Sequence, residues 1–258
     1  MKRTDGQTAV KSALINLLFP LVSVAAMIAL YAIAAAVVGE SLVLPKISEI
    51  LKEAGKLAVS AEFYKALVFT LLRALAAFAA AFVVGSALAV AANRLKPLKK
   101  ALAPIMTFLR AVPTMAVIFL LTLWFRSVFA PVVVAFTVLM PLSYSQTAAA
   151  LASLDDGIFE MCKVYKVPKK KVLTKFVLPQ IVPQIADSAA GNLSFGVKLV
   201  IAGEALAQTA ASLGGALNLA NIYIDTARLL AITLIAVAVC FAVESAVRLV
   251  ALLSRRWQ

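Results

Sequence analysis

The chain has 258 residues, 63% of them hydrophobic, and a formal net charge of +13. Its mean hydropathy is +0.99, an apolar excess that indicates a membrane protein and not a soluble globular domain. The basic residues stand in short tracts between apolar stretches. We therefore interpret them as topology signals and expect no nucleic-acid partner.

Several chemistries are absent from the sequence. There is no histidine, and the two cysteines, Cys162 and Cys240, form no CxxC motif or metal-binding spacing. No phosphate-binding loop of the GxxxxGK[ST] type occurs. We expect no metal, no cofactor and no enzymatic activity in this chain, so any ATP that drives it must bind to another protein.

The first half of the chain contains two long apolar stretches. Residues 12–39 form an uncharged apolar run that is too long for a signal peptide core and is expected to be a retained membrane span. Apolar residues at helical spacing over 47–57 predict a short amphipathic helix at the membrane interface. A second span is expected over 65–93, followed by a basic, proline-containing cytoplasmic turn at 93–100.

The third and fourth spans are interrupted by proline. The span over 101–125 contains Pro104, Arg110 and Pro113, which predict a kinked or broken helix. The span over 127–154 is uncharged and carries Pro141 near its middle.

A polar loop over 153–183 separates the fourth span from the fifth, which is expected over 184–207. Residues 208–226 are expected to form a short re-entrant or outer helix, and 227–253 to form the sixth span. Six spans place both termini on one side of the membrane. Most lysines and arginines fall on that side, which predicts that the termini and the 153–183 loop are cytoplasmic.

The fold class is therefore all-α. We expect one polytopic membrane domain over residues 1–258, with about six transmembrane helices, a short periplasmic amphipathic helix and a structured cytoplasmic loop.

The 153–183 loop reads as two short helices around a break. Asp155 and Asp156 are typical of a helix start, Val167-Pro168 interrupts the helix, and a second segment begins at Lys169 and is expected to end at Leu178-Pro179. Its apolar residues and lysine cluster favour a protein-docking surface. The alternative is a basic loop that rests on anionic lipid headgroups.

These residues resemble the permease subunits of bacterial ABC importers, whose cytoplasmic loop has the pattern E-A-A-x3-G-x9-I-x-L-P. Glu160 and Leu178-Pro179 match this pattern, whereas Lys166 stands at the glycine position and Phe176 at the isoleucine position. The segments LVLPKISEIL, LRAVPTMAVIFLLTLWF and VIAGEALA are also similar to the family, in particular to its nitrate, sulfonate, taurine and thiamine-precursor branch. Because lysine cannot take a positive φ as cheaply as glycine, we expect the loop to turn at Val167-Pro168, with Lys166 in an ordinary conformation.

The resemblance implies a type I ABC importer permease in the bacterial inner membrane. Two permease copies, expected as a homodimer, would form the pathway, and two cytoplasmic ATPase subunits would each hold one loop. An extracytoplasmic binding protein would deliver a small, anionic or vitamin-like solute. The resemblance also implies which residues couple the chain to an ATPase: Asp156, Phe159, Glu160, Cys162, Lys163, Tyr165, Lys166, Pro168, Leu178 and Pro179.

Ionisable residues inside spans are candidates for the translocation pathway. Asp187, Gly191, Ser194 and Lys198 recur at helical spacing on one face of the fifth span, and Lys198 would favour an anionic group. The alternative is that this face packs against another helix or subunit. Arg110 either faces the pathway or caps carbonyls freed near Pro113. We interpret the remaining intramembrane charges, Arg73 and Glu204, as packing or interface ion pairs.

Two other classes of function remain as alternatives. A secondary carrier would work without an ATPase and would usually show inverted repeats, which are not evident in this sequence. An integral membrane enzyme has little support, because no histidine, thiol motif or pair of carboxylates within a span is present.

Overall fold

A computed structural model describes residues 4–255, and over this range the chain is helical and forms no strand. The helices, in chain order, are α1 (Thr4–Val38), α2 (Ile47–Val59), α3 (Ala61–Arg94), α4 (Lys96–Ala111), α5 (Thr114–Trp124), α6 (Ala130–Ala152), α7 (Asp156–Val164), α8 (Lys169–Val172), the π-helical turn η1 (Leu173–Val177), α9 (Leu178–Leu206), α10 (Leu213–Ile222) and α11 (Thr226–Arg255). The all-α prediction is confirmed.

Five of the described helical segments are long and apolar enough to cross a membrane, and the bent pair α4 and α5 makes a sixth if it is one span. The five segments are Leu21–Val38, Ala61–Arg94, Ala130–Ala152, Lys169–Leu206 and Thr226–Leu249. They correspond to the first, second, fourth, fifth and sixth spans expected from the sequence. The chain is therefore a multi-pass membrane protein.

The α4–α5 pair confirms the predicted break in the third span. The two helices meet at an angle of 93°. Pro113 stands directly before α5, at the end of the extended residues that separate the helices, whereas Pro104 lies within α4 without ending it. A proline at the N-cap loses no helical hydrogen bond, because an N–H at that position would have had no helical partner.

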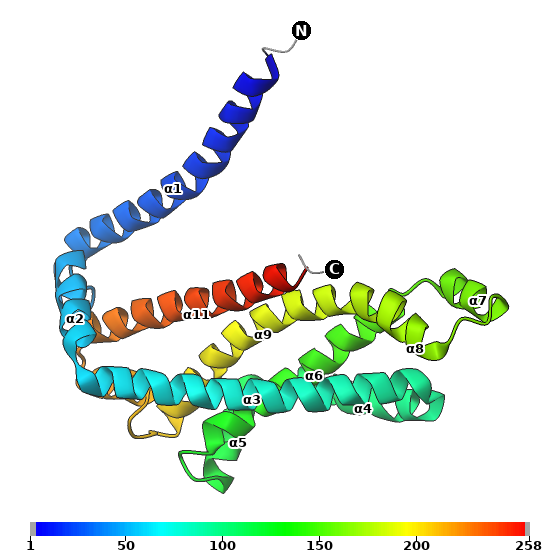
Figure 1. Ribbon diagram of the computed structural model, residues 1–258. Helices are drawn as coiled ribbons and strands as arrows, with labels where there is room; N and C mark the ends of the chain where they lie inside the picture. The colour runs from blue at the N-terminus through cyan, green and yellow to red at the C-terminus, as the bar shows by residue number, and fades with distance from the viewer. Residues whose placement is uncertain (1–3, 256–258) are drawn as a thin grey trace.

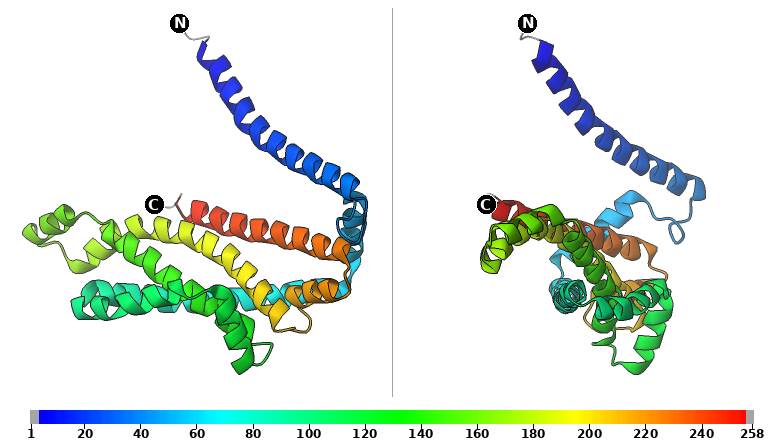
Figure 2. Two further views of the ribbon diagram at one scale, coloured as in Figure 1. Left: turned by 180° about the vertical axis from the view of Figure 1, so that it is seen from behind. Right: turned by 90° about the vertical axis from the view of Figure 1, so that its right-hand side faces the viewer.

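Helix α1 projects away from the other helices (Figures 1 and 2). Over its span, most of its apolar side chains are exposed, and Ala35 is an exception. The Tyr31 hydroxyl donates to the Pro45 carbonyl at 2.8 Å and so ties the end of α1 to the start of α2. As expected, α2 is amphipathic: Ile50 and Leu57 are buried, and its lysines and glutamates lie mainly on the other faces, where Leu51 and Val59 are also exposed.

Helix α3 packs closely on α6 through a stripe of small side chains. The buried residues of α3 recur every three or four positions: Phe63, Ala66, Thr70, Ala74, Ala77, Ala81, Gly85, Ala89 and Ala92. At Gly85 an added Cβ would lie 2.5 Å from the Met140 carbonyl oxygen of α6. Small residues at this spacing allow two helices to approach closely in a membrane, where van der Waals packing replaces the hydrophobic effect as the main attraction.

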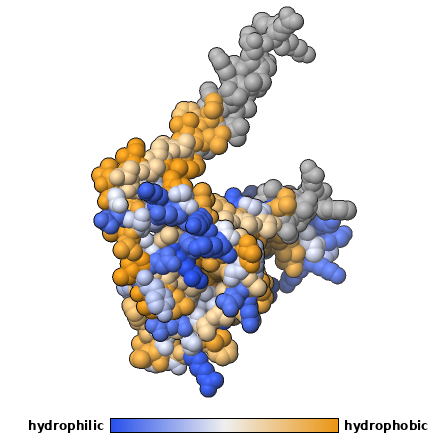
Figure 3. All heavy atoms as spheres, turned by 90° about the vertical axis from the view of Figure 1, so that its left-hand side faces the viewer, coloured by the Kyte–Doolittle hydropathy of each residue, from blue (hydrophilic) through white to orange (hydrophobic). Residues whose placement is uncertain are grey.

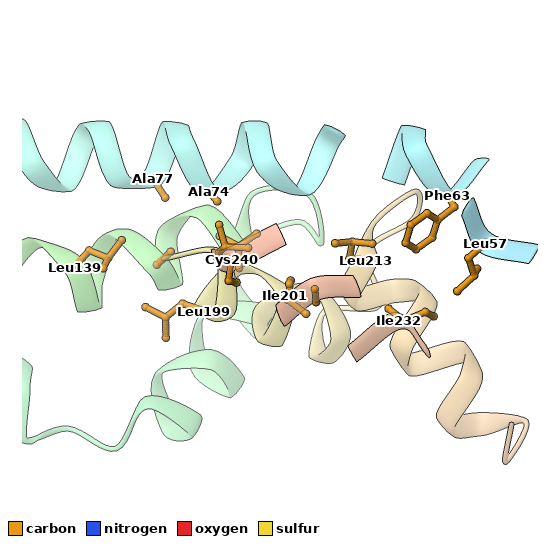
Figure 4. Close-up of a cluster of buried hydrophobic side chains, with 14 of the residues drawn as sticks. Leu57, Phe63, Ala74, Ala77, Leu139, Leu199, Ile201, Leu213, Ile232 and Cys240 are labelled. Carbon is orange, nitrogen blue, oxygen red and sulfur yellow. The ribbon is translucent and has the colours of Figure 1, made fainter. Parts of the chain in front are cut away.

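The main apolar core fills the space between α3, α6, α9, α10 and α11 (Figure 4). Leu139 of α6, Val200 of α9, Leu213 of α10 and Ile232 of α11 are fully buried within it. Alanines of α3 complete the core on the opposite side. This core fixes the positions of two features at opposite ends of the bundle: α7 and α8 at one end, and the α9–α11 connection with α2 at the other (Figure 1).

Candidate functional site

The elbow, defined as residues 153–177, extends beyond one end of the bundle as a short helix and a tight turn (Figure 1). Helix α7 begins after Asp155, whose side chain accepts a hydrogen bond from the Gly157 N–H at 2.8 Å. Asp156 in the first turn and Lys163 in the last turn both complement the helix dipole. These end signals support the helix, although none of its side chains is fully buried.

The expected conformation of Lys166 is wrong, because its φ is +52°. The Lys166 N–H bonds to the Lys163 carbonyl at 3.1 Å, and the Val167 N–H bonds to the Cys162 carbonyl at 2.9 Å. This pair of bonds is a Schellman motif, which requires a left-handed residue at its turn. Pro168 disfavours a helical conformation for Val167, so the helix must end before it and the left-handed position falls on the lysine.

The expected helix end at Leu178-Pro179 is also wrong. The helix that begins at Lys169 continues without a break to Leu206. Directly before the proline the chain forms the π-turn η1, in which the Leu178 N–H bonds to the Leu173 carbonyl. The wider turn relieves the clash that the Pro179 ring would otherwise make with the preceding helical turn, so the helix passes through the proline.

Two aromatic rings attach α7 to the long helix that continues into α9. Phe159 of α7 packs edge to face on Phe176, with 5.3 Å between the ring centroids and an interplanar angle of 81°. Both rings border a small cluster of buried residues, Ala150, Val177 and Ile181. Helix α7 is therefore held both by α6 and by the long helix that continues into α9.

The residues predicted to couple to an ATPase divide by exposure. The exposed ones are Asp156, Glu160, Lys163, Tyr165, Lys166, Pro168 and Leu178. The half-buried ones are Phe159, Cys162 and Pro179. The elbow thus presents charged and aromatic side chains outward while Phe159 anchors it.

The predicted pathway residues lie along α9, but they do not share one environment. Asp187, Gly191 and Lys198 have exposed positions in the single chain, whereas Ser194 is buried. The Ser194 carbonyl accepts a long contact of 3.8 Å from Cys240 Sγ, which places that side of α9 against α11. The exposed ammonium of Lys198 on a membrane-spanning surface requires a water-filled path or a further protein segment to cover it.

Arg110 lies on α4, whereas the other predicted pathway residues lie on α9. Its Nη2 atom reaches the Pro141 carbonyl of α6 at 3.5 Å, at the outer limit of a hydrogen bond. The side chain is otherwise exposed. The contact is with a carbonyl of α6 and not with one near Pro113.

A buried ionic network joins α3, α9 and α10. The sequence alone did not predict that these three helices meet at one set of polar groups. The Glu204 side chain is fully buried and accepts from Arg73 Nη1 at 2.8 Å and from Thr70 Oγ1 at 2.8 Å. The Gly214 N–H also donates to Glu204 at 3.2 Å, and the Leu213 N–H donates to Thr70 Oγ1 at 3.0 Å. We call this set the Glu204 network. It confirms that Arg73 and Glu204 belong to an ion pair, and the signal available in the sequence was their opposite charge inside two apolar spans.

A second polar layer crosses α6. Gln146 and Asn192 exchange two side-chain hydrogen bonds, at 3.1 Å and 2.5 Å, between α6 and α9. Thr147 Oγ1 lies 3.0 Å from Ser86 Oγ of α3. These polar residues therefore hold helices together inside the bundle.

The other end of the molecule carries two neighbouring cavities, of about 600 and 480 Å³. Both are lined in part by the connector segment, defined as residues 207–225, and both are bordered by Tyr223 and Asp225. Tyr223 is 77% exposed and stands beside Ile224, which has a φ of +56°, an unusual value for a β-branched residue. Figure 3 looks onto this end and shows hydrophilic residues gathered among hydrophobic ones.

More than half of the chain matches a known protein family. Residues 81–256 match the family described as "Binding-protein-dependent transport system inner membrane component". No curated protein matches the chain.

Solved structures with the same fold include two crystal forms of the MetNI methionine ABC transporter in inward-facing conformations. The native form has a TM-score of 0.61 and 18% identity, covering 73% of this chain and 94% of that chain. The selenomethionine-soaked form has a TM-score of 0.60 and 17% identity, covering 74% and 94%. An amino acid ABC transporter crystallised with histidines gives a TM-score of 0.61 and 16% identity, covering 76% and 94%. At these identities the likeness shows a shared fold.

Proposed function

From its match over residues 81–256 the chain belongs to the family of binding-protein-dependent transport system inner membrane components, and we propose that it forms the solute pathway and receives the ATP-driven stroke at its elbow. The chain is the permease component of an ABC importer, a multi-pass inner-membrane protein with the type I importer permease fold. It is not itself catalytic, because in this family a partner subunit hydrolyses ATP.

The observation that carries the proposal is the construction of the elbow. Its contact surface, which includes Glu160, Lys163 and Tyr165, is exposed, yet the segment is fixed at both ends. The Schellman turn at Lys166 closes α7, and the Phe159–Phe176 contact attaches it to the bundle. A docking element that must transmit force has to be stiff, and a lipid tether has no need of this construction.

In this proposal two copies of the chain face each other across the pathway. Asp187, Gly191 and Lys198 would then line the space between the copies, where water or the second copy would meet the Lys198 ammonium. A lysine in this position favours a solute with an anionic group. The substrate class that we propose is therefore a small organic anion or vitamin-like molecule, in keeping with the resemblance to the nitrate, sulfonate, taurine and thiamine-precursor branch.

The elbow end is assigned to the cytoplasm and the connector end to the outside. The basic elbow supports this orientation, because positively charged segments are retained on the cytoplasmic side. An extracytoplasmic binding protein would then meet the surface around Tyr223 and Asp225, which borders both cavities.

The proposal is tested with the tagged chain purified from its native membranes under mild detergent. We expect a tightly bound subunit, identified by mass spectrometry, and Mg-ATP hydrolysis by the purified sample. The Glu160→Lys variant should lose that subunit or its coupling to transport, while the amount of chain in the membrane stays the same. As a control, Glu244→Gln removes a partly exposed carboxylate that pairs with Arg248 on α11, and should retain the subunit.

Two results would contradict the proposal. One is solute uptake into liposomes by this chain alone, which would indicate a secondary carrier. The other is full ATP-coupled transport by the Glu160→Lys variant, which would mean that the elbow does not receive the ATPase.

A further inference from the structure

The Glu204 network buries an ion pair at a place where burial is costly. The Glu204 side chain is 0% exposed, and the Arg73 side chain is 14% exposed. Removing two charges from water costs several kcal/mol per ion, and a well-packed apolar pair is often as stable or more stable. Stability alone is therefore a poor reason for this arrangement. Its bonds instead fix the relative positions of the segments that it joins.

Those segments are three separate parts of the fold. Thr70 and Arg73 belong to α3, Glu204 to α9, and the donating N–H groups of residues 213 and 214 to the start of α10. Glu204 thus connects the end of α9 both to a neighbouring span and to the connector segment.

The contact between α10 and α9 leaves little freedom to slide. At Gly214 an added Cβ would lie 2.2 Å from the Ile201 carbonyl oxygen and 2.5 Å from Glu204 Cβ. At Gly215 an added Cβ would lie 2.2 Å from the Thr209 carbonyl oxygen. Glycine is required at both positions because the backbones approach too closely for any side chain. A shift of the end of α9 must therefore move the start of α10.

The opposite end of the same helix lies in the elbow. The continuous helix Lys169–Leu206 has 38 residues, which corresponds to an axis of about 57 Å. Phe176, the partner of Phe159 in α7, lies near the start of this helix, and Glu204 lies near its end. Figure 1 shows α8 and α9 running from the elbow to the connector end. One continuous, curved helix thus joins the two ends of the molecule.

We propose that Glu204 is a positioning residue that passes the ATP-driven movement of the elbow, delivered along the Lys169–Leu206 helix, to α3 and to the connector segment. The inference rests on the proposed function and deepens it, because it names the joint at which a cytoplasmic stroke reaches the extracytoplasmic cavities. Thr209, Ser212 and Gly215 line the larger cavity and lie directly beside this joint, so movement there changes the cavity wall.

The experiment uses the complex of the chain with its co-purified ATPase in nanodiscs. Ala210, an exposed residue of the connector segment, is replaced by cysteine in a chain that carries Cys162→Ser and Cys240→Ala. A water-soluble maleimide reports the labelling rate of this thiol with and without ATP and vanadate. We expect trapping with vanadate to change the rate by about threefold or more in the otherwise native complex, as a shift between two states requires.

Two variants interrupt the joint in different ways. Glu204→Gln keeps the size of the side chain and removes its charge. The double variant Arg73→Met and Glu204→Met removes both charges, and so leaves no unpaired ion to unfold the protein. In both, the vanadate-dependent change in labelling should disappear, while ATP hydrolysis and subunit binding persist. Glu244→Gln, on the exposed Glu244–Arg248 pair, should keep the full change.

The outcomes are distinguishable. If the ATPase is missing from the native sample, the proposed function fails and the inference falls with it. If the ATPase is present and traps vanadate but the Ala210→Cys rate does not change, the connector segment does not move and the inference alone is overturned. The same holds if the rate still changes fully in the double variant, since the network would then serve packing only.

Discussion

Gln146 and Asn192 exchange two hydrogen bonds across the interface of α6 and α9, so that each amide is both donor and acceptor to the other. Their distances are 3.1 Å and 2.5 Å. Asn192 is buried and Gln146 is half-buried. In a membrane such a pair fixes the rotation of one helix against the other, because any other register would leave amide groups without partners in an apolar medium.

This reciprocity predicts an asymmetry between single and double substitutions. Asn192→Leu should lower the free energy of unfolding by about 1–2 kcal/mol, because it leaves the Gln146 amide unpaired. The double variant Gln146→Leu and Asn192→Leu should lose less than the single one, because no unpaired amide remains. Thermal denaturation of the purified chain in one detergent compares the two. Equal losses would show that the pair makes no coupled contribution.

The close approach of α3 and α6 predicts a strong effect of one added methyl group. Gly85→Ala should lower stability by about 1–3 kcal/mol, because its Cβ would meet the Met140 backbone oxygen, which cannot move without displacing α6. Gly55→Ala is the control. It lies on an exposed part of α2 with no atom within 4 Å of its added Cβ, and should be neutral or stabilising because alanine favours the helix. The same thermal assay applies, and a harmless Gly85→Ala would contradict the packing described here.

The spans were predictable from the sequence because their signal is local. A long apolar run such as 12–39 or 65–93 has few alternatives in a membrane protein, and Pro113 correctly predicted the break in the third span. The Asp155 start of α7 is equally local. Membership of the permease family was predicted from the same segments and is confirmed, whereas the branch and the substrate stay predictions.

The features that sequence analysis missed depend on contacts between distant residues. Nothing near Thr70 in the sequence indicates that its hydroxyl joins residues 204 and 213. The conformation of Lys166 was mispredicted because the preference of lysine for a negative φ is local, whereas the hydrogen bonds that close α7 require a positive φ at this position. The helix through Pro179 was mispredicted because a π-turn has no clear sequence signal.

The left-handed lysine in the elbow predicts a stabilising substitution. Lys166→Gly should stabilise the closed end of α7 by about 1 kcal/mol, since glycine takes a φ of +52° without the steric cost that a side chain carries. Lys166→Val should weaken it, because a β-branched residue is less tolerant of this conformation. Hydrogen exchange of the α7 amides measures both effects. Slower exchange in the valine variant than in the glycine variant would contradict the Schellman turn.

Two exposed tyrosines at opposite ends predict two different partners. Tyr165 in the elbow and Tyr223 at the connector are 76% and 77% exposed. In native membranes, a benzophenone attached at Tyr165→Cys should crosslink to the ATPase subunit, and one at Tyr223→Cys to an extracytoplasmic binding protein. Mass spectrometry identifies the products. The reverse assignment of partners would overturn the proposed orientation of the chain.

Lys198 offers a test of the pathway that needs no knowledge of the solute. If this residue faces water between two copies of the chain, the thiol of Lys198→Cys should react with a water-soluble maleimide in intact membranes, because maleimides react with the hydrated thiolate. Leu234→Cys on α11 is the control, since it is also exposed in the single chain and lies at a comparable distance from the connector end of its helix. Both variants are made without the native cysteines. A lipid-facing thiol stays protonated and unreactive, so we expect labelling of residue 198 and not of residue 234. If neither reacts, α9 turns this face to lipid or to a dry interface, and the anionic substrate class loses its support. If both react, the reagent reaches lipid-facing positions, and only a reduced rate at residue 198 in the presence of a competing organic anion would then support the pathway.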